Sequence, residues 1–376
     1  MEEKEEGKSL RVCRCFLVGC GRISRRHIKA IAENRNEVEL VGVSDLQILR
    51  AKEVQDECRA LGLPPPRLFG AFDPAMLRAT QSDFCVIATP SGLHAGMAQN
   101  VLRAGFSVLV EKPMALSSRG ALVMIEEAER RGLILGVCHQ NRFNPAVMAA
   151  YTAMQQGDFG DVYHLEGQMW WNRDPAYYKQ APWRGTYRMD GGVLMNQGIH
   201  MADLLCWFAG SELVEVQGMV HRYARPIEAE DFGAALLRFA DGKMAVFSGT
   251  ALVYPQNLSE TLALFGSEGC AVIGGTAVDR VQTWHSQKDP PVLSQPDVQK
   301  PAADIYGNGH TPLYRDFVRA LREKGRPLVD GAAGFRSMQT VLAIYASHKR
   351  GEKILLRSFR FSVDEMRREK VKGRGR

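Results

Sequence analysis

The 376-residue chain lacks several features that would each define a class of protein. It has no apolar run near the roughly 20 residues that cross a bilayer, and its charged start, residues 1–6, has no apolar signal region. We therefore expect a cytoplasmic protein that does not bind a membrane. Eight cysteines are scattered without cysteine–histidine zinc spacing. Buried reduced thiols are expected, with no metal site and no disulfides.

The chain also lacks a strong charge of one sign except at its end. The net charge is +6, and basic residues gather in 366–376. Such a tail could contact nucleic acid, but a solvated terminus is the commoner use, so no nucleic-acid partner is expected. The length exceeds one compact core. We predict tails at 1–10 and 357–376 around two domains, 11–140 and 141–356.

The first domain alternates strand and helix patterns, which predicts a doubly wound parallel sheet. Strand 12–18 runs into a glycine-containing turn, 19–24, that opens a helix whose free N–H groups can hold a pyrophosphate. Strand 38–43 ends near Asp45, whose carboxylate would bind the adenosine ribose and favour NAD over NADP. Asp45 could instead cap the next helix, and Arg50 could accept a 2′-phosphate. The cofactor-binding residues expected in the turn are Gly19, Gly21, Arg22 and Ile23.

The stretch 106–113 ends a buried strand at Glu111-Lys112-Pro113. Ligands of open α/β sheets bind beyond the carboxyl ends of the strands, so Glu111 and Lys112 are expected beside the cofactor. Pro113 restricts its own φ and the conformation of Lys112, which directs the lysine. A solvated ion pair at an ordinary strand end is the alternative. Further cofactor contacts are expected at other strand ends, namely at Thr89, Pro90, His94, Gln140 and Arg142.

The second domain loses this alternation and is rich in strand patterns. The strands are expected at 162–171, 212–221, 230–240, 243–253, 258–266 and 269–273. They predict an open, mainly antiparallel sheet, so the fold class is α/β: an N-terminal Rossmann domain plus a C-terminal α+β domain. A large sheet face needs cover, so a homodimer or homotetramer is expected. The aromatic segment 170–186 could stack on a ligand or form a domain interface.

A predicted helix at 193–208 carries a polar stripe. Asn196, His200 and Asp203 are spaced to share one face of an otherwise apolar helix that Asp190-Gly191-Gly192 is expected to open. A lone helical histidine is more often structural, but three aligned polar residues favour chemistry.

Together these motifs resemble the glucose–fructose oxidoreductase/inositol dehydrogenase/MocA (GFO/IDH/MocA) family from Arg11 to about Leu356. The residues that carry the resemblance are 19–23, 88–90, His94, 111–113, and 191–203. Within the family the chain is most similar to the UDP-N-acetyl-2-amino-2-deoxyglucuronate 3-dehydrogenases. That likeness is carried by 140–144, 177–186, 254–258 and 306–310.

The resemblance implies NAD-dependent oxidation of the C3 hydroxyl of a UDP-linked N-acetyl hexuronate, a nucleotide-sugar substrate, for a surface polysaccharide. It implies three catalytic residues. His200 would be the general base, Lys112 would stabilise the reacting oxygen, and Asn196, where the family commonly has Asp, would orient the sugar. The other implied substrate contacts are Arg173, Tyr178, Tyr254 and Asn257.

Three other functions stay open: another sugar or polyol dehydrogenase of this family, an NAD-dependent glycoside hydrolase, and a non-catalytic dinucleotide sensor. The presence of both Lys112 and His200 argues against the sensor. We also expect a cis peptide bond between Lys112 and Pro113, and convergence of the Lys112 and His200 nitrogens on one substrate hydroxyl.

Overall fold

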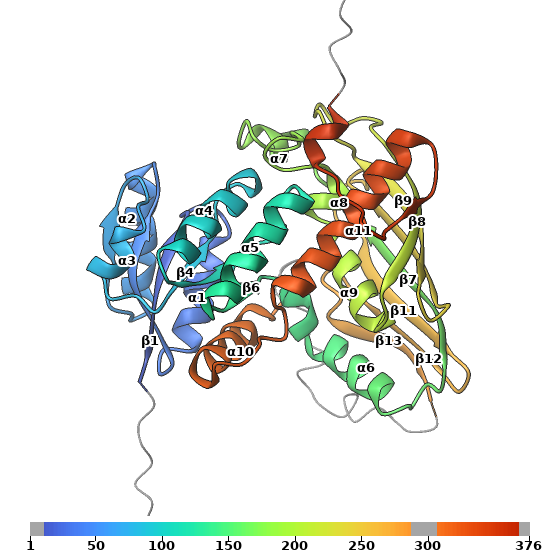
Figure 1. Ribbon diagram of the computed structural model, residues 1–376, viewed down its shortest axis with the longest axis horizontal. Coiled ribbons are helices and arrows are strands. Elements are labelled where there is room, and N and C mark those ends of the chain that lie inside the picture. The colour runs from blue at the N-terminus through green and yellow to red at the C-terminus, as the bar shows by residue number, and fades with distance from the viewer. Residues whose placement is uncertain (1–10, 287–306, 368–376) are drawn as a thin grey trace, which may run out of the picture.

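A computed structural model of the chain describes residues 11–286 and 307–367 (Figure 1). It contains two sheets, and the first confirms the expected doubly wound domain. All pairings of this six-stranded sheet are parallel, in the order β3-β2-β1-β4-β5-β6. Its elements are β1 (Cys13–Val18), α1 (Ser24–Glu33), β2 (Val38–Ser44), α2 (Ile48–Ala60), β3 (Arg67–Phe69), α3 (Ala75–Ala79), β4 (Phe84–Ile87), α4 (Ser91–Arg103), β5 (Ser107–Val110), α5 (Ser118–Arg131) and β6 (Leu135–Val137).

The second sheet has eight strands in the order β13-β12-β11-β7-β10-β9-β8-β14. All its neighbours pair antiparallel except β7 and β10, which are parallel. The elements up to β8 are η1 (Gln140–Phe143), α6 (Pro145–Gln155), β7 (Val162–Trp170), α7 (Pro175–Lys179), α8 (Val193–Asn196), α9 (Ile199–Ala209) and β8 (Leu213–His221). The remaining elements are β9 (Phe232–Phe239), β10 (Met244–Thr250), β11 (Ser259–Gly266), β12 (Cys270–Gly274), β13 (Arg280–His285), α10 (His310–Glu323), α11 (Gly331–Arg350), β14 (Ile354–Leu355) and η3 (Val363–Met366).

Burial follows the two sheet types. Strands β4 and β5 are buried at every position, as expected for strands covered on both faces. Strands β8, β9 and β10 alternate, and α8, α9 and α11 lie over one face of their sheet (Figure 1). The opposite face exposes large apolar side chains: Met219, Leu236, Met244 and Val246.

The expectation of a single helix at 193–208 is wrong, because the helix is interrupted between α8 and α9. A Cβ on Gly198 would lie 3.0 Å from the Phe247 ring and 3.2 Å from the Leu194 Cα. A larger residue at this close approach to β10 would require its neighbours to shift slightly. His200 lies in the first turn of a new helix, α9.

The expected tail at 357–376 is wrong in its first part. Phe361 and Val363 are buried. The backbone N–H of Ser118 donates to Phe361 O at 2.9 Å, and the N–H of Val363 donates to Leu116 O at 2.9 Å. Residues up to 367 are thus folded onto the start of α5, while the basic residues beyond 367 lie outside the described part. The proline-rich, polar stretch 285–303, where the sequence predicts a loop, also lies mostly outside it.

Helix α10 returns to the first domain late in the sequence. Tyr314 and Phe317 join the core beneath the parallel sheet, with the Phe317 ring centroid 5.1 Å from that of Phe84. Asn34, at the end of α1, donates to Thr311 O at 2.9 Å. Figure 1 shows α10 beside α1. The helix that opens at the glycine turn is therefore braced by residues nearly 300 positions later.

The other composition-based expectations can be compared with the structure directly. All eight cysteines are free, and all but Cys270 are buried. In the described ranges, none of the helices is both long and apolar enough for a membrane span.

Candidate active site

The glycine turn between β1 and α1 has the geometry that a dinucleotide pyrophosphate needs. Gly19 has a φ of +96°, and a Cβ there would lie 2.5 Å from Ala88 O, so only glycine fits. A Cβ on Gly21 would meet no atom within 4 Å, so the space beside it is open. No acidic side chain occupies the first turn of α1, so no negative charge opposes an anion at its start. The N–H groups of Ser24 and Arg26 donate to Gly21 O and Ile23 O, respectively.

The Asp45 carboxylate stabilises this turn through hydrogen bonds to two backbone N–H groups. Its Oδ2 accepts the N–H of Cys20 at 2.9 Å, and its Oδ1 accepts the N–H of Gln47 at 2.8 Å. The carboxylate thus joins the glycine turn to the segment before α2. It does not cap α2, whose N-cap residue is Gln47 without a side-chain cap hydrogen bond. Arg22 points elsewhere: it is exposed and donates to Gln180 at 3.1 Å, next to α7.

Lys112 lies just after β5, and its peptide bond to Pro113 is cis. The prediction of a cis bond at this position is confirmed. The Lys112 Nζ donates to Asn196 O at 2.7 Å, and the Lys112 backbone N–H donates to Glu111 Oε2 at 3.2 Å. Both ends of the half-buried lysine are therefore held. Burial lowers the pKa of Lys112, and Glu111 is the strongest opposing influence on that pKa.

His200 lies four residues beyond the carbonyl that Lys112 contacts. Among the described residues neither of its ring nitrogens has a hydrogen-bond partner, and Nδ1 is buried. Burial, the Lys112 charge and two nearby histidines lower the pKa of His200 well below its usual value, so the ring is neutral at pH 7. The structure brings Lys112 to the α8–α9 junction, while convergence of the two nitrogens on one substrate atom stays a prediction.

Asp190 is a site residue that the sequence reasoning missed. Its Oδ1 accepts the Asn196 side-chain N–H, and its Oδ2 accepts the Gly185 N–H at 2.7 Å. Burial raises the pKa of Asp190 to about 6, against the opposing effect of these hydrogen bonds and of Lys112. The residue orients Asn196. Its place directly before two glycines was interpreted only as a helix start, and its distance of six residues from Asn196 was the available signal.

Two expected cofactor contacts are structural in this fold. The Arg142 guanidinium is buried, and its Nε and Nη2 each lie 2.7 Å from the carboxylate of Asp203. Its Nη1 donates to Leu328 O at 3.3 Å. The His94 ring nitrogens lie 2.8 Å from Thr89 O and Pro113 O. These polar groups are committed to the protein, so Arg142 and Asp203 belong to the core and His94 joins two loops. Gln140 is also buried.

The expected substrate contacts are only partly brought together. Arg173 is 8% exposed, stacks over the Trp171 ring and donates to Asn257 Oδ1 at 3.2 Å. Tyr178 is 8% exposed, whereas Tyr254 is 91% exposed and stands apart from the others. Arg173 and Asn257 therefore form one polar group, and Tyr254 is not part of it in a single chain.

A second buried acid also escaped the sequence reasoning. Glu260 on β11 is fully buried, and neither carboxylate oxygen has a hydrogen-bond partner in the described part of the chain. Burial raises the pKa of Glu260 to about 8, although Lys112 and Arg173 oppose the change. The side chain is therefore mainly protonated at neutral pH.

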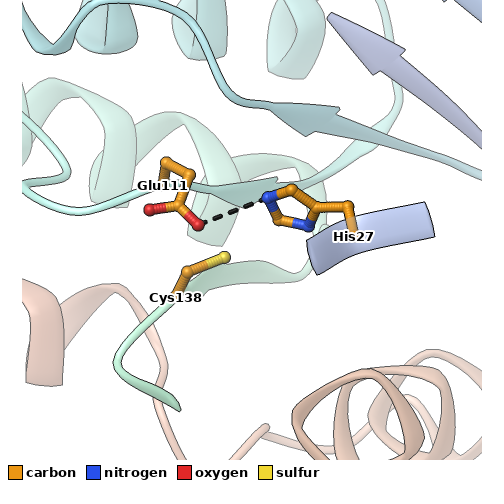
Figure 2. Close-up of side chains that lie close together, drawn as sticks. All are labelled: His27, Glu111 and Cys138. Atoms are coloured by element: carbon orange, nitrogen blue, oxygen red, sulfur yellow. Dashed lines mark ion pairs between the residues drawn. The ribbon is translucent and has the colours of Figure 1, made fainter. Parts of the chain in front are cut away.

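Glu111, whose Oε2 accepts the Lys112 N–H, also belongs to a buried cluster. Its Oε1 lies 3.3 Å from His27 Nε2, and the Cys138 thiol lies beside both (Figure 2). The three donor atoms lie within 4.8 Å of one another, which is close enough to hold a metal ion. Burial raises the pKa of the Cys138 thiol well above its usual value, whereas a metal would need the thiolate. The expectation of no metal stays a prediction.

A doubly wound parallel sheet with a glycine turn between its first strand and first helix is typical of dinucleotide-binding oxidoreductases. Comparisons with known proteins agree. Residues 13–139 match the model of the oxidoreductase family with an NAD-binding Rossmann fold, and residues 147–272 match the GFO/IDH/MocA C-terminal domain. The chain belongs to the GFO/IDH/MocA family.

Two solved relatives are similar over nearly the whole chain. The WlbA dehydrogenase from Bordetella pertussis, in complex with NADH and UDP-GlcNAcA, is 35% identical with a TM-score of 0.80 over 93% of this chain and 100% of that one. The WlbA dehydrogenase from Chromobacterium violaceum, with the same ligands, is 32% identical with a TM-score of 0.82 over 93% and 97%. A UDP-N-acetylglucosamine 3-dehydrogenase from Acidithiobacillus ferrooxidans is 26% identical over 88% of this chain and 96% of that protein.

Proposed function

We propose that the protein oxidises the C3 hydroxyl of a UDP-linked N-acetylglucosaminuronate to the 3-keto sugar, with reduction of NAD to NADH. The observation that carries the proposal is the contact of Lys112 Nζ with Asn196 O, next to the unpaired His200 ring. The two WlbA relatives, solved with NADH and UDP-GlcNAcA, support the substrate class.

The residues have separate roles in this reaction. His200, neutral at pH 7, takes the proton of the C3 hydroxyl, and the Lys112 amine donates a hydrogen bond to the same oxygen as its charge grows. Asn196, held by Asp190, positions the sugar ring. The hydride acceptor for C3 would be supplied by bound NAD. The Gly19–Ile23 turn and Asp45 hold the cofactor, and Arg173 with Asn257 receives the polar end of the substrate.

The test is NADH formation with a panel of substrates. UDP-N-acetylglucosaminuronate should turn over with the highest kcat/KM, ahead of UDP-N-acetylglucosamine, UDP-glucuronate, apiose and inositol. His200→Asn should lower kcat by roughly 10²–10⁴-fold, Lys112→Ala at least as much, and NADH affinity should stay near that of the wild type. Arg25→Gln, in an exposed pair, is the control.

Two results would contradict the proposal. Preferential oxidation of a free sugar or polyol would show the other dehydrogenase activity, and release of UDP or a cleaved sugar without net NADH would show a hydrolase. We further propose that the product serves the synthesis of a surface polysaccharide, and that the apolar sheet face forms a homodimer or homotetramer.

A further inference from the structure

The buried cluster beside Lys112 links the cofactor helix to the catalytic lysine. His27 lies on α1, four residues after Ile23 at the start of that helix. Its Nδ1 lies 2.9 Å from the Tyr314 hydroxyl on α10, and its Nε2 faces Glu111 Oε1 at 3.3 Å. Glu111 in turn binds the backbone N–H of Lys112. A continuous series of polar contacts thus runs from α10 through α1 to the lysine.

The burial of these groups makes their contacts energetically important. His27 is 0% exposed and Glu111 is 6% exposed. Within the described chain, His27 Nε2 and Glu111 Oε1 make no hydrogen bond, so the 3.3 Å ion-pair contact between them is their main compensation for removal from water. Figure 2 shows the Nε2 edge of the His27 ring directed at the carboxylate.

We propose that His27 and Glu111 form a positioning pair that fixes the orientation of Lys112 and keeps a negative charge beside it. The proposal relies on the proposed function only for the role of Lys112 in turnover. His27 touches no reacting atom, so it acts through Glu111. The pair also connects α1, whose start holds the pyrophosphate, to the catalytic lysine.

The electrostatic effect of the pair can be stated from the groups around it. Burial tends to raise the pKa of Glu111, but His27, His310 and Lys112 outweigh it and lower that pKa to about 2, so Glu111 is ionised. The other titratable groups that influence Glu111 or are influenced by it are His94, Cys138, His139 and Tyr314. The further charged or titratable groups around Lys112 are Arg173, Arg184, Asp190, His200 and Glu260.

Two substitutions of His27 separate its contacts. A Gln amide nitrogen replaces Nε2, and so keeps a donor toward Glu111, whereas an Asn amide replaces Nδ1 and keeps only the contact with Tyr314. His27→Asn should lower the pKa of Lys112 by about one unit, because an unpaired buried carboxylate becomes protonated. His27→Gln should leave it near that of the wild type. The measurement is NMR of [13C]methylated lysines, with the Lys112 signal assigned by its loss in Lys112→Arg.

Glu111→Gln is isosteric and should lower the Lys112 pKa as His27→Asn does. The double variant should show no additional fall, because both changes remove one interaction. In turnover, His27→Asn should reduce kcat about 10-fold and shift the alkaline side of the pH profile to lower pH, with NADH affinity unchanged. Cys138→Ala removes only the thiol beside Glu111 and should change each measurement less than His27→Asn does.

Three results would overturn the proposal: equal effects of His27→Asn and His27→Gln, an unchanged Lys112 pKa in Glu111→Gln, or one equivalent of metal per chain by elemental analysis. In the last case His27, Glu111 and Cys138 would be ligands, and Cys138→Ala would be as damaging as His27→Asn. Should neither His27 variant fold, the Glu111→Gln result decides. Failure of the proposed function can be distinguished from failure of this proposal. If the wild type oxidises no UDP-sugar, the proposed function fails, but the pKa of Lys112 can still be measured in every variant.

Discussion

Removal of the Asp203 carboxylate should destabilise the protein strongly and leave cofactor binding intact. Asp203 is 1% exposed, and its two oxygens each lie 2.7 Å from a nitrogen of Arg142, which lies 4.9 Å from the Trp207 ring. Asp203→Asn leaves a buried guanidinium without its counter-charge. Breaking such a pair costs about 3–5 kcal/mol, so the free energy of unfolding in urea should fall by that amount.

A double variant tests whether the loss of stability comes from the unpaired buried guanidinium or from the loss of the ion pair itself. Arg142→Met with Asp203→Leu removes both charges and should recover most of the lost stability, because apolar groups of similar volume replace a buried ion pair well. Asp56→Asn, which breaks the exposed pair with Arg59, is the control and should cost at most ~1 kcal/mol. The reasoning is refuted if Arg142→Met is as stable as the wild type but binds NADH tenfold more weakly, since Arg142 would then contact the cofactor.

Three further predictions concern the cofactor, pH and assembly. Asp45→Ala should weaken NAD binding and reduce the preference over NADP in calorimetric titration, because the carboxylate that holds the Cys20 N–H is lost; unchanged selectivity would contradict this. Burial raises the pKa of Glu230 from 4.5 to about 8, so between these pH values the folded state retains a proton that the unfolded chain releases. The free energy of unfolding should therefore fall as the pH rises from 4.5 to 8, by at most ~5 kcal/mol. Glu230→Gln should flatten that fall in urea titrations, and an identical pH dependence would exclude Glu230 as its source. Light scattering should show a dimer or tetramer, since Met219, Leu236 and Met244 are exposed on one sheet face, and a monomer at micromolar concentration would be inconsistent with it.

The parts of the site that follow local sequence signals were predictable. The turn at Gly19 and Gly21, the acid at Asp45 and the stretch Glu111–Pro113 each follow a strand, and parallel strands place their carboxyl ends at one edge. The cis bond before Pro113 was expected from the family resemblance. A strand's end and a sharp turn are visible in a few adjacent residues.

The parts that depend on contacts between distant segments were not predictable. Asp203 was grouped with His200 by helical spacing, but its partner is Arg142, 61 residues earlier. Asp190 was interpreted as a helix start, and His27 was not singled out, because its partner Glu111 is on another element. Periodicity reports which face of an element is buried and carries no information on which buried polar groups meet.

The sequence by itself determined the class of both sheets, the location of the glycine turn and the motif that carries Lys112, because these depend on residue spacing within one element. Only the tertiary structure decided that the helix before His200 is interrupted near Gly198, which packs closely against Phe247 on β10. It also decided that α10 and the segment 357–367 return to the first domain. Burial of their apolar faces against a sheet hundreds of residues earlier is a long-range effect, and no local pattern encodes it.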